Sequence, residues 1–255
     1  MTSLTPDPQA RYAAHLRIPG FGPEGQARAR RAKVIVVGLG GLGSPAALYL
    51  AAAGVGKLGL LDADRVELSN LQRQVLHTTP RTGMSKVESA ATALGALNPE
   101  VVLQRHATRL TEDNAASLLD PYDFIVEACD DFPAKYTIND TCLKLRKPFV
   151  TAGVARLTGQ AMLVVPGQSP CLRCVVPEQP DAAPDARTAG ILGPVAGLMG
   201  CMETVQALRY IAGLWSPEPD GAGMLHSLDG DTMRLRTLRT RRKRDCRCAE
   251  CWSTP

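Results

Sequence analysis

Hydrophobic and polar positions follow one another along the chain in blocks that predict alternating strands and helices. Val34–Val37 is a β-branched run without a polar break, which is typical of a strand buried on both faces of a parallel sheet. A glycine-rich turn and the alanine-rich helix SPAALYLAAAG follow, and this helix is expected to end at Gly54. Lys57–Leu61 predicts a second strand, and VVLQRHA predicts a third.

The alternation continues to about residue 154. A helix is predicted from Gly83 or Ser85 to about Leu97, and a shorter helix over TEDNAASLL. Phe124–Val126 predicts a buried strand, residues from Phe132 onward a helix, and KPFVTAGV a fifth strand. Upstream, residues 1–32 predict a polar lead-in, with a helix over RYAAHLRI and a turn-rich loop over PGFGPEGQ.

Beyond Val154 the pattern changes. GQAMLVV predicts a strand antiparallel to the others, and Ile191–Leu214 predicts a long buried helix. The segment CVVPEQPDAAPDARTAG predicts a mobile crossover loop, and MLHSLDG and TMRLRTLRT predict two further strands. The expected fold is therefore α/β, with a doubly wound, mostly parallel Rossmann-like sheet that is extended by antiparallel strands.

Composition and charge exclude several classes of protein. Hydrophobic residues make up 45% of the 255 residues, so a sizeable core can be buried, and the net charge of +4 is too small to indicate a nucleic-acid partner. No apolar run reaches the roughly 18 residues of a membrane span. The first residues, MTSLTPDPQARY, lack the apolar core of a signal peptide, which predicts a cytoplasmic protein. Eight cysteines then indicate metal or redox chemistry more than disulfides.

The glycine turn carries the first chemical signal. Gly38, Gly40 and Gly43 have G-x-G-x-x-G spacing, with Gly41 in addition, between a predicted strand and a predicted helix. This arrangement directs backbone N–H groups and a helix N-terminus at a phosphate, although it can also serve only to pack a helix on a strand. The motif does not choose between NAD, FAD and ATP. Asp62 follows the second strand, where an acidic residue usually holds a ribose hydroxyl; the alternative is a solvated aspartate.

Polar residues also gather after two of the predicted strands. The long segment after Asp62 contains Arg73, Gln74 and Lys86, and Lys86 falls in the first turn of a predicted helix. The helix dipole disfavours a cation there, so either an anionic ligand lies nearby or the lysine is simply solvated. Asp130 and Asp131 follow the strand Phe124–Val126, at the edge where open α/β sheets bind ligands.

Taken together, these motifs resemble the E1-like adenylating enzymes of the ThiF/MoeB/HesA family. The matching pieces are GLGGLGS, LLDAD, LSNLQRQ, SKVESA, DDFPAKYTIND, AGILGPV and two CxxC pairs, and they extend from about Arg11 to Cys251. The resemblance implies an E1-like adenylation fold over 1–255 as a single domain. It divides this domain into a nucleotide-binding half at 33–154 and a carrier-binding half at 155–255.

The resemblance also implies an activity and its partners. Such enzymes use ATP and Mg²⁺ to adenylate the C-terminal glycine carboxylate of a small ubiquitin-like sulfur-carrier protein ending in Gly-Gly, and they release pyrophosphate. A homodimer and a sulfurtransferase partner are implied as well. The related families serve thiamine, molybdopterin, thiolated tRNA and cysteine synthesis.

Roles for individual residues follow from the same resemblance. Gly41 is expected to pack against the nucleotide, Asp62 to hold the ribose, Arg73 and Lys86 to bind the phosphates, and Asp130 to carry Mg²⁺. Asp130, Arg73 and Lys86 are the expected catalytic residues. The full expected nucleotide site comprises Gly38, Gly40, Gly41, Gly43, Asp62, Asp64, Ser69, Asn70, Arg73, Gln74, Lys86, Asp130 and Asp131.

Two CxxC pairs that are distant in sequence predict a structural Cys₄ zinc site. The pairs are Cys171 with Cys174 and Cys248 with Cys251, and zinc would fasten the C-terminal tail to the region near residue 170. Each pair alone could be a redox motif, and Cys246 is a possible competitor for Cys248. The arginines around the second pair either solvate the surface or attract an acidic partner.

Four positions depart from the family pattern. Ala14 stands where the family's N-terminal R-Y-x-R-Q segment often has the arginine that enters the partner subunit, while Arg11 and Arg17 remain. Ala186 replaces a crossover-loop cysteine found in many members, and Cys129-Asp130-Asp131 replaces Thr-Asp-Asn.

Two other functions fit part of the sequence: an NAD-dependent oxidoreductase, which would need neither Arg73 nor Lys86, and a catalytically idle carrier-binding scaffold.

Overall fold

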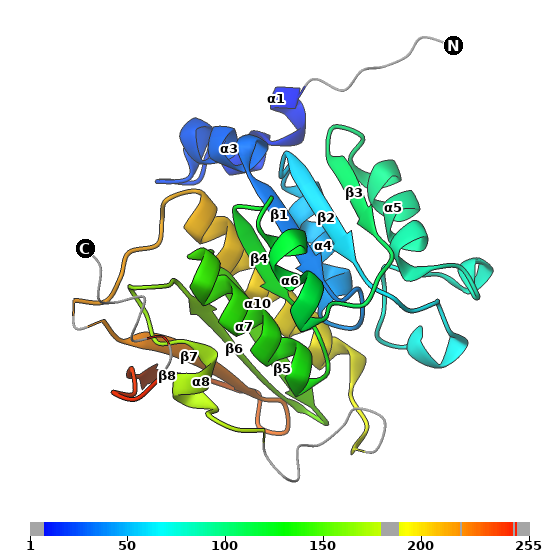
Figure 1. Ribbon diagram of the computed structural model, residues 1–255. Helices are drawn as coiled ribbons and strands as arrows, with labels where there is room; N and C mark the ends of the chain where they lie inside the picture. The colour runs from blue at the N-terminus through cyan, green and yellow to red at the C-terminus, as the bar shows by residue number, and fades with distance from the viewer. Residues whose placement is uncertain (1–7, 180–188, 220, 247, 249–255) are drawn as a thin grey trace.

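The computed structural model describes residues 8–179, 189–219, 221–246 and 248. Its eight strands form one sheet in the order β3-β2-β1-β4-β5-β6-β7-β8 (Figure 1). The strands β1 to β5 run parallel, and β6, β7 and β8 continue the sheet antiparallel, which confirms the predicted fold class. Their bounds are β1 Lys33–Val37, β2 Lys57–Leu61, β3 Val102–His106, β4 Phe124–Glu127, β5 Phe149–Ala155, β6 Thr158–Val164, β7 Gly223–Asp229 and β8 Arg234–Thr240.

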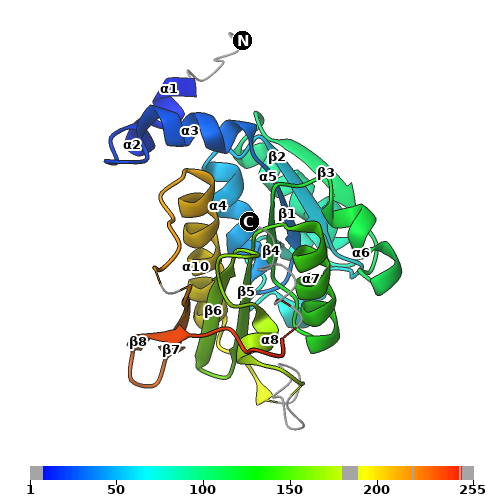
Figure 2. The same ribbon diagram turned by 60° about the vertical axis from the view of Figure 1, so that its left-hand side comes forward.

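Helices cover both faces of the sheet (Figure 2). One face carries α4 Gly43–Ala52, α5 Lys86–Leu97 and α10 Gly193–Ile211, and the other carries α6 Glu112–Leu119 and α7 Phe132–Leu145. Short elements complete the described chain: α1 Pro8–Arg11, α2 Ala13–Leu16, α3 Gly22–Arg31, η1 Leu68–Asn70, η2 Thr79–Arg81 and α8 Leu172–Val175. No helix in the described ranges is long and apolar enough to cross a membrane.

The central strand β1 shows why the sequence has no polar break there. Val34 and Val36 belong to the core beneath α4, α5 and α10, whereas Ile35 and Val37 belong to the core beneath α6 and α7. All four side chains are buried, because successive strand residues point to opposite covered faces. Burying each such side chain stabilises the fold by about 1.5–3 kcal/mol relative to exposure.

The N-terminal region differs from its prediction. The helix expected over RYAAHLRI is divided into α1 and α2. The loop expected over PGFGPEGQ extends only to Phe21, and the rest of that prediction is wrong because α3 begins at Gly22. Pro23 occupies the first turn of α3, where its missing N–H costs no hydrogen bond, and Glu24 is favourable beside the helix N-terminus. The proline and glycines that resemble a turn therefore begin a helix, which is anchored by buried Gln26 and Ala29.

The remaining elements agree closely with the predictions. The helix expected from Gly83 or Ser85 begins at Lys86 and ends at Leu97, and GQAMLVV lies within the antiparallel strand β6. The long helix expected over Ile191–Leu214 is α10. The expected crossover loop falls largely on 180–188, which lie outside the described residues.

Candidate nucleotide and carrier-tail site

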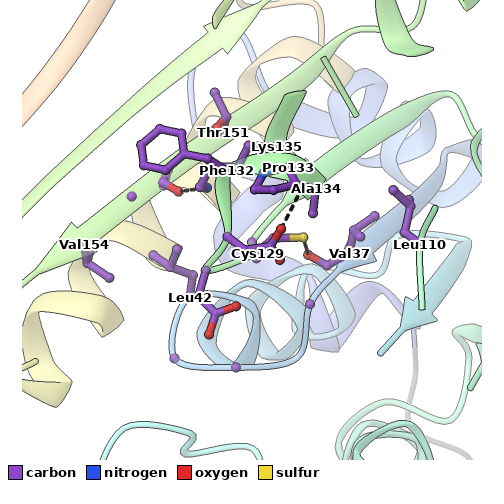
Figure 3. Close-up of a pocket in the computed structure, with 18 of the residues that line it drawn as sticks. Val37, Leu42, Leu110, Cys129, Phe132, Pro133, Ala134, Lys135, Thr151 and Val154 are labelled. Carbon is purple, nitrogen blue, oxygen red and sulfur yellow. Dashed lines mark hydrogen bonds between the residues drawn. The ribbon is translucent and has the colours of Figure 1, made fainter. Parts of the chain in front are cut away.

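A cavity of about 950 Å³ opens at the carboxyl ends of the parallel strands. Its lining begins at the glycine turn after β1, continues past the ends of β2 and β4, and reaches the strands β5, β6 and β7. Figure 3 shows the middle of this cavity, where Val37, Cys129, Lys135 and Thr151 lie around the start of α7. A single cavity therefore joins the predicted nucleotide-binding half to the predicted carrier-binding half.

Close packing explains why two positions of the turn are glycine. Gly38 has φ +93°, and a Cβ there would lie 2.6 Å from the carbonyl oxygen of Ala128. At Gly43 a Cβ would lie 1.8 Å from the carbonyl oxygen of Gly38, so only glycine lets α4 begin directly against the turn. Gly38, Gly40 and Gly41 line the cavity, whereas Gly43 does not line it. The backbone of the turn and the N-terminus of α4 are thus placed to bind an anion.

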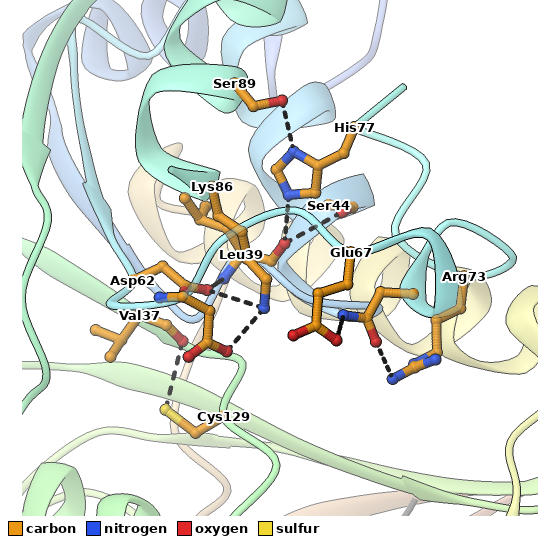
Figure 4. Close-up of polar contacts among 12 residues, drawn as sticks. Val37, Leu39, Ser44, Asp62, Glu67, Arg73, His77, Lys86, Ser89 and Cys129 are labelled. Carbon is orange, nitrogen blue, oxygen red and sulfur yellow. Dashed lines mark hydrogen bonds and ion pairs between the residues drawn. The ribbon is translucent and has the colours of Figure 1, made fainter. Parts of the chain in front are cut away.

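Two backbone N–H groups hold the Asp62 carboxylate in place. Its Oδ2 accepts a hydrogen bond of 2.8 Å from the Leu39 N–H, and its Oδ1 accepts one of 2.8 Å from the Asp64 N–H (Figure 4). The side chain lines the cavity although only 9% of the residue is exposed. This carboxylate is therefore fixed in position with lone pairs left for a ligand's hydroxyl groups.

Lys86 is buried in the first turn of α5 and is not a solvated surface lysine. Its Nζ lies 3.0 Å from Asp64 Oδ2 and 3.9 Å from Asp62 Oδ2. These two carboxylates neutralise a cation that is 5% exposed beside a helix N-terminus. Because Asp64 is exposed, a polyphosphate entering the cavity can replace it as the partner of Lys86.

Arg73 and Gln74 supply further polar groups to the same end of the cavity. Arg73 Nη2 donates a 3.1 Å hydrogen bond to Asn70 Oδ1, which orients the guanidinium. Gln74 is 4% exposed, and its Oε1 has no hydrogen-bond partner among the described residues. A buried amide oxygen without a partner is costly, so this atom indicates a ligand that would donate to it.

The two predicted contacts Ser69 and Asn70 do not line the cavity. Both side chains donate hydrogen bonds to Glu67 Oε2, at 3.3 Å from Ser69 Oγ and 3.5 Å from Asn70 Nδ2. Asn70 therefore contributes to the site by orienting the Arg73 guanidinium.

Asp130 and Asp131 differ in role although they are adjacent. Asp131 is the N-cap of α7, and its Oδ1 accepts a 2.8 Å hydrogen bond from the Ala134 N–H. The Asp130 carboxylate lines the cavity and makes no hydrogen bond or ion pair with any described residue. Exposed carboxylate oxygens of this kind are suitable ligands for Mg²⁺.

Sequence reasoning missed a buried network beneath Asp130. The Glu127 carboxylate accepts hydrogen bonds from the Cys129 N–H at 2.8 Å, from Lys135 Nζ at 2.8 and 3.0 Å, and from Thr151 Oγ1. Lys135 also donates to the Ala152 carbonyl, so the network joins β4, β5 and the start of α7. Burial alone would lower the pKa of Lys135, but the Glu127 carboxylate outweighs it and the pKa is raised. The only sequence signal was a charged residue inside the buried strand FIVE.

A second acid lies near this network. Glu203 of α10 is fully buried, and neither of its carboxylate oxygens has a hydrogen-bond partner among the described residues. Burial, reinforced by the Glu127 carboxylate and opposed by Lys135, raises the pKa of Glu203 well above its ordinary value, which favours the protonated form of this side chain.

Cys129 lies beside the same network and directly before Asp130. Burial and then the Glu127 carboxylate raise the pKa of its thiol well above the ordinary value. The Sγ lies 3.6 Å from the Val37 carbonyl oxygen, to which the protonated thiol donates. Cys129 is therefore a poor nucleophile although it borders the cavity.

The far end of the cavity has a different lining. Gly153 and Val154 of β5, Gly159 and Gln160 of β6, and Ser227 of β7 contribute to it. The small side chains of this lining suit an extended peptide segment with little side-chain bulk.

Four thiols gather between α8 and the C-terminal tail. One sulfur atom from each of Cys171, Cys174, Cys246 and Cys248 lies within 4.8 Å of all the others. Individual sulfur–sulfur distances are 3.9 Å for Cys171–Cys174, 3.5 Å for Cys171–Cys246 and 3.4 Å for Cys174–Cys248. A tetrahedral Zn–S₄ centre needs about 3.8 Å between sulfurs, so the donors fit this metal. The predicted ligand Cys251 lies outside the described residues.

A doubly wound sheet whose glycine turn, strand-end carboxylates and buried cation share one cavity defines a nucleotide-binding protein of the Rossmann-like class. The model of the ThiF family matches residues 12–250, and the chain belongs to this family. The resemblance inferred from the motifs is thereby confirmed.

Two known proteins are similar to the chain in sequence. The protein named adenylyltransferase and sulfurtransferase MOCS3 of Drosophila yakuba is 42% identical over 100% of this chain and 56% of its own length. The Anopheles gambiae protein of the same name is 39% identical over 100% of this chain and 57% of its own length. The chain thus spans little more than half the length of these relatives.

Solved structures show the same fold. E. coli MccB with MccA-N7isoASN superposes with a TM-score of 0.84 at 22% identity, covering 98% of this chain and 76% of that chain. E. coli MccB with ATP superposes with a TM-score of 0.81 at 22% identity, covering 94% and 74%.

Proposed function

We propose that this protein is an ATP-dependent adenylyltransferase that activates the C-terminal glycine carboxylate of a small ubiquitin-like sulfur-carrier protein. The observation that carries the proposal is the continuity of the cavity. Its nucleotide end is lined by Gly41, Asp62, Arg73 and Lys86, and its far end is lined by residues of β5, β6 and β7. Asp130 follows β4, the strand that lies between these two ends.

In this reaction the carrier carboxylate attacks the α-phosphate of ATP and pyrophosphate leaves. The turn at Gly38–Leu42 and the N-terminus of α4 receive phosphate oxygens, Asp62 accepts from the ribose, and Gln74 Oε1 accepts from a ligand hydroxyl or amino group. Arg73 and Lys86 stabilise negative charge on the leaving pyrophosphate. Asp130 would hold Mg²⁺, which supplies charge neutralisation between the phosphates when bound.

The far end of the cavity suits a carrier tail that ends in Gly-Gly. Glycine residues lack the side chains that would collide with β5, β6 and Ser227. The exposed arginines Arg234 and Arg236 on the outermost strand β8 offer positive charge for the folded body of an acidic carrier. The adenylate would then pass to a sulfurtransferase partner.

Incubation of the protein with ATP, Mg²⁺ and a carrier ending in Gly-Gly tests this proposal. We expect mass spectrometry to show a carrier whose mass has increased by one adenylate group, and no increase with a carrier that lacks the last glycine. Melting curves with ATP–Mg²⁺ and with NAD test the oxidoreductase alternative, because a ligand stabilises only the protein that binds it. A melting shift with NAD alone would contradict the proposal, and carrier binding without adenylate would instead support an idle scaffold.

We also propose a homodimer that forms through α4 and α10. These helices pack against each other on one face of the sheet and expose Tyr49 at 58%, Leu198 at 50% and Val205 at 56%. Leu198 and Val205 lie two helical turns apart on one side of α10. The helix α7, on the opposite face of the sheet, exposes no large hydrophobic side chain among its described residues.

We expect sedimentation to show a dimer at micromolar concentration. The double variant Leu198→Glu, Val205→Glu should be monomeric, because four charged side chains would be buried in a two-fold interface. Leu235→Glu is a matched control, since Leu235 is 57% exposed on β8, far along the sheet from α4. A monomeric wild type, or a dimer that persists in the double variant, would refute this interface.

A further inference from the structure

His77 is a buried histidine outside the cavity lining that connects two parts of the nucleotide site. It is 4% exposed, and its Nε2 lies 3.0 Å from the Leu39 carbonyl oxygen. Its Nδ1 lies 2.9 Å from Ser89 Oγ, so the ring bridges the glycine turn and α5 (Figure 4). Both ring nitrogens are therefore engaged within the protein.

The Leu39 end of this bridge lies in the centre of the glycine turn. Leu39 has glycine on both sides, and glycine-flanked backbone is conformationally soft. Its N–H donates to Asp62 at 2.8 Å and its carbonyl oxygen faces His77, so external groups hold this residue from both sides. Ser44 Oγ adds a longer hydrogen bond of 3.5 Å to the same carbonyl oxygen, and these contacts together orient the neighbouring peptide N–H groups, which would face the phosphates.

The Ser89 end of the bridge lies on the helix that carries Lys86. Ser89 is three residues after Lys86 and thus one turn further along α5, on the same side of the helix. The backbone of His77 adds a third connection, because its N–H donates a 3.0 Å hydrogen bond to the Gln74 carbonyl oxygen. One residue consequently joins the glycine turn, the Lys86 helix and the segment that carries Arg73 and Gln74.

The contacts determine the protonation of the ring. A carbonyl oxygen only accepts, so Nε2 carries the proton, and Nδ1 of the neutral ring accepts from the Ser89 hydroxyl. Burial lowers the pKa of His77; the Leu39 carbonyl and Asp62 oppose this effect, whereas Lys86 and Arg81 add to it. The ring is therefore neutral at neutral pH.

We propose that His77 is a positioning residue that fixes the glycine turn relative to the Lys86 helix, so that the backbone N–H groups and the ammonium group meet the same polyphosphate. This inference rests on the proposed binding of ATP. His77 does not touch the nucleotide in this arrangement, since it is not among the residues that line the cavity. Its removal should weaken ATP binding more than it slows the chemical step.

Two variants of His77 test its hydrogen bonds to Leu39 and to Ser89 separately. In His77→Gln the longer side chain can still donate to the Leu39 carbonyl, whereas in His77→Asn the shorter one reaches only toward Ser89. We expect the Asn variant to raise the Kd and KM for ATP about tenfold, which corresponds to about 1.4 kcal/mol, and to keep kcat within about twofold. The Gln variant should remain within about threefold of the wild type in both constants.

Hydrogen exchange in the nucleotide-free protein provides a readout that does not depend on activity. We expect the amides of Leu39 and Gly40 to exchange faster in His77→Asn than in the wild type, and those of β4 to be unchanged. His15→Gln is the matched control, because His15 also makes a histidine hydrogen bond, 2.9 Å to Gln26, at α2 and away from the cavity. This control should leave the KM for ATP and the exchange of the glycine turn unaltered.

The outcomes distinguish this inference from the proposed function. A wild-type protein that binds no ATP would overturn the proposed function, and with it the role of His77 in nucleotide affinity. A wild type that binds ATP, together with a folded His77→Asn variant of equal affinity and unchanged exchange at Leu39, would overturn the positioning role alone. A loss of kcat with an unchanged KM would overturn it as well.

Discussion

Replacement of Asp130 by alanine is expected to slow carrier-dependent exchange of pyrophosphate into ATP by about a hundredfold to a thousandfold, the range lost when one preorganised charge contact to a transition state is removed. The Asp130 carboxylate lines the cavity between its two ends and has no hydrogen-bond or ion-pair partner among the described residues. Its removal should therefore leave the fold intact, because no described contact is broken. Circular dichroism and a melting curve would verify this.

Two further aspartate variants make the Asp130 result specific. Asp120→Ala removes an aspartate outside the cavity, 67% exposed and paired with Lys147 at 3.6 Å, and should retain full exchange activity. Asp131→Asn keeps an oxygen that can accept from the Ala134 N–H, so α7 stays capped and the exchange rate should fall less than about tenfold. Near-normal exchange by a folded Asp130→Ala variant would show that the assigned role is wrong.

The nucleotide end of the cavity was largely predictable, because its parts lie at the ends of local elements. Gly38, Asp62 and Asp130 each follow a buried strand, and parallel strands bring their carboxyl ends to one edge. The periodicity of strands and helices was therefore enough to predict that these three residues lie at the same edge of the sheet. Lys86 was placed in the first turn of α5 by the same reasoning.

The parts that depend on packing between distant elements were not predictable from local patterns. Glu127 meets Lys135 from the next helix and Thr151 from the next strand, and Glu203 approaches from α10. His77 similarly needs the three-dimensional path of the segment after Asp62 to reach both Leu39 and Ser89. Residue spacing carries no information on such contacts, because each depends on how a helix sits on the sheet.

The orientation of short polar side chains is also difficult to predict from sequence. Ser69 and Asn70 carry donors suited to a nucleotide, but η1 turns both toward Glu67. The local hydrogen bonds of such residues compete with ligand contacts, and sequence alone does not decide between them. In α3 the same kind of ambiguity arises from glycine and proline, which are found both in turns and in the first turn of a helix.

A Cys174→Ser variant is expected to lose the metal completely, from about one zinc ion per chain to nearly none in elemental analysis. We propose that this zinc is structural and that it fastens the C-terminal tail to α8. Cys174 is central to the contact, since its sulfur lies 3.4 Å from that of Cys248 and accepts from the Lys243 N–H at 3.5 Å. Loss of one thiolate should therefore lower the melting temperature and increase proteolysis of the tail, because metal binding contributes directly to folding free energy.

Matched cysteine variants identify the remaining ligands. Cys201→Ser should keep its zinc, because Cys201 lies on α10 and outside the cluster of thiols. The two CxxC pairs of the sequence favour Cys251 as the fourth ligand. Among the described residues, however, Cys246 is the fourth cysteine of the cluster. A four-thiolate site has room for one of them, so only one of Cys246→Ser and Cys251→Ser should release the metal. Retention of zinc in both variants would contradict a four-thiolate site completed by either residue. Protein purified without chelators that contains no zinc and forms disulfides under mild oxidation would instead favour the redox alternative.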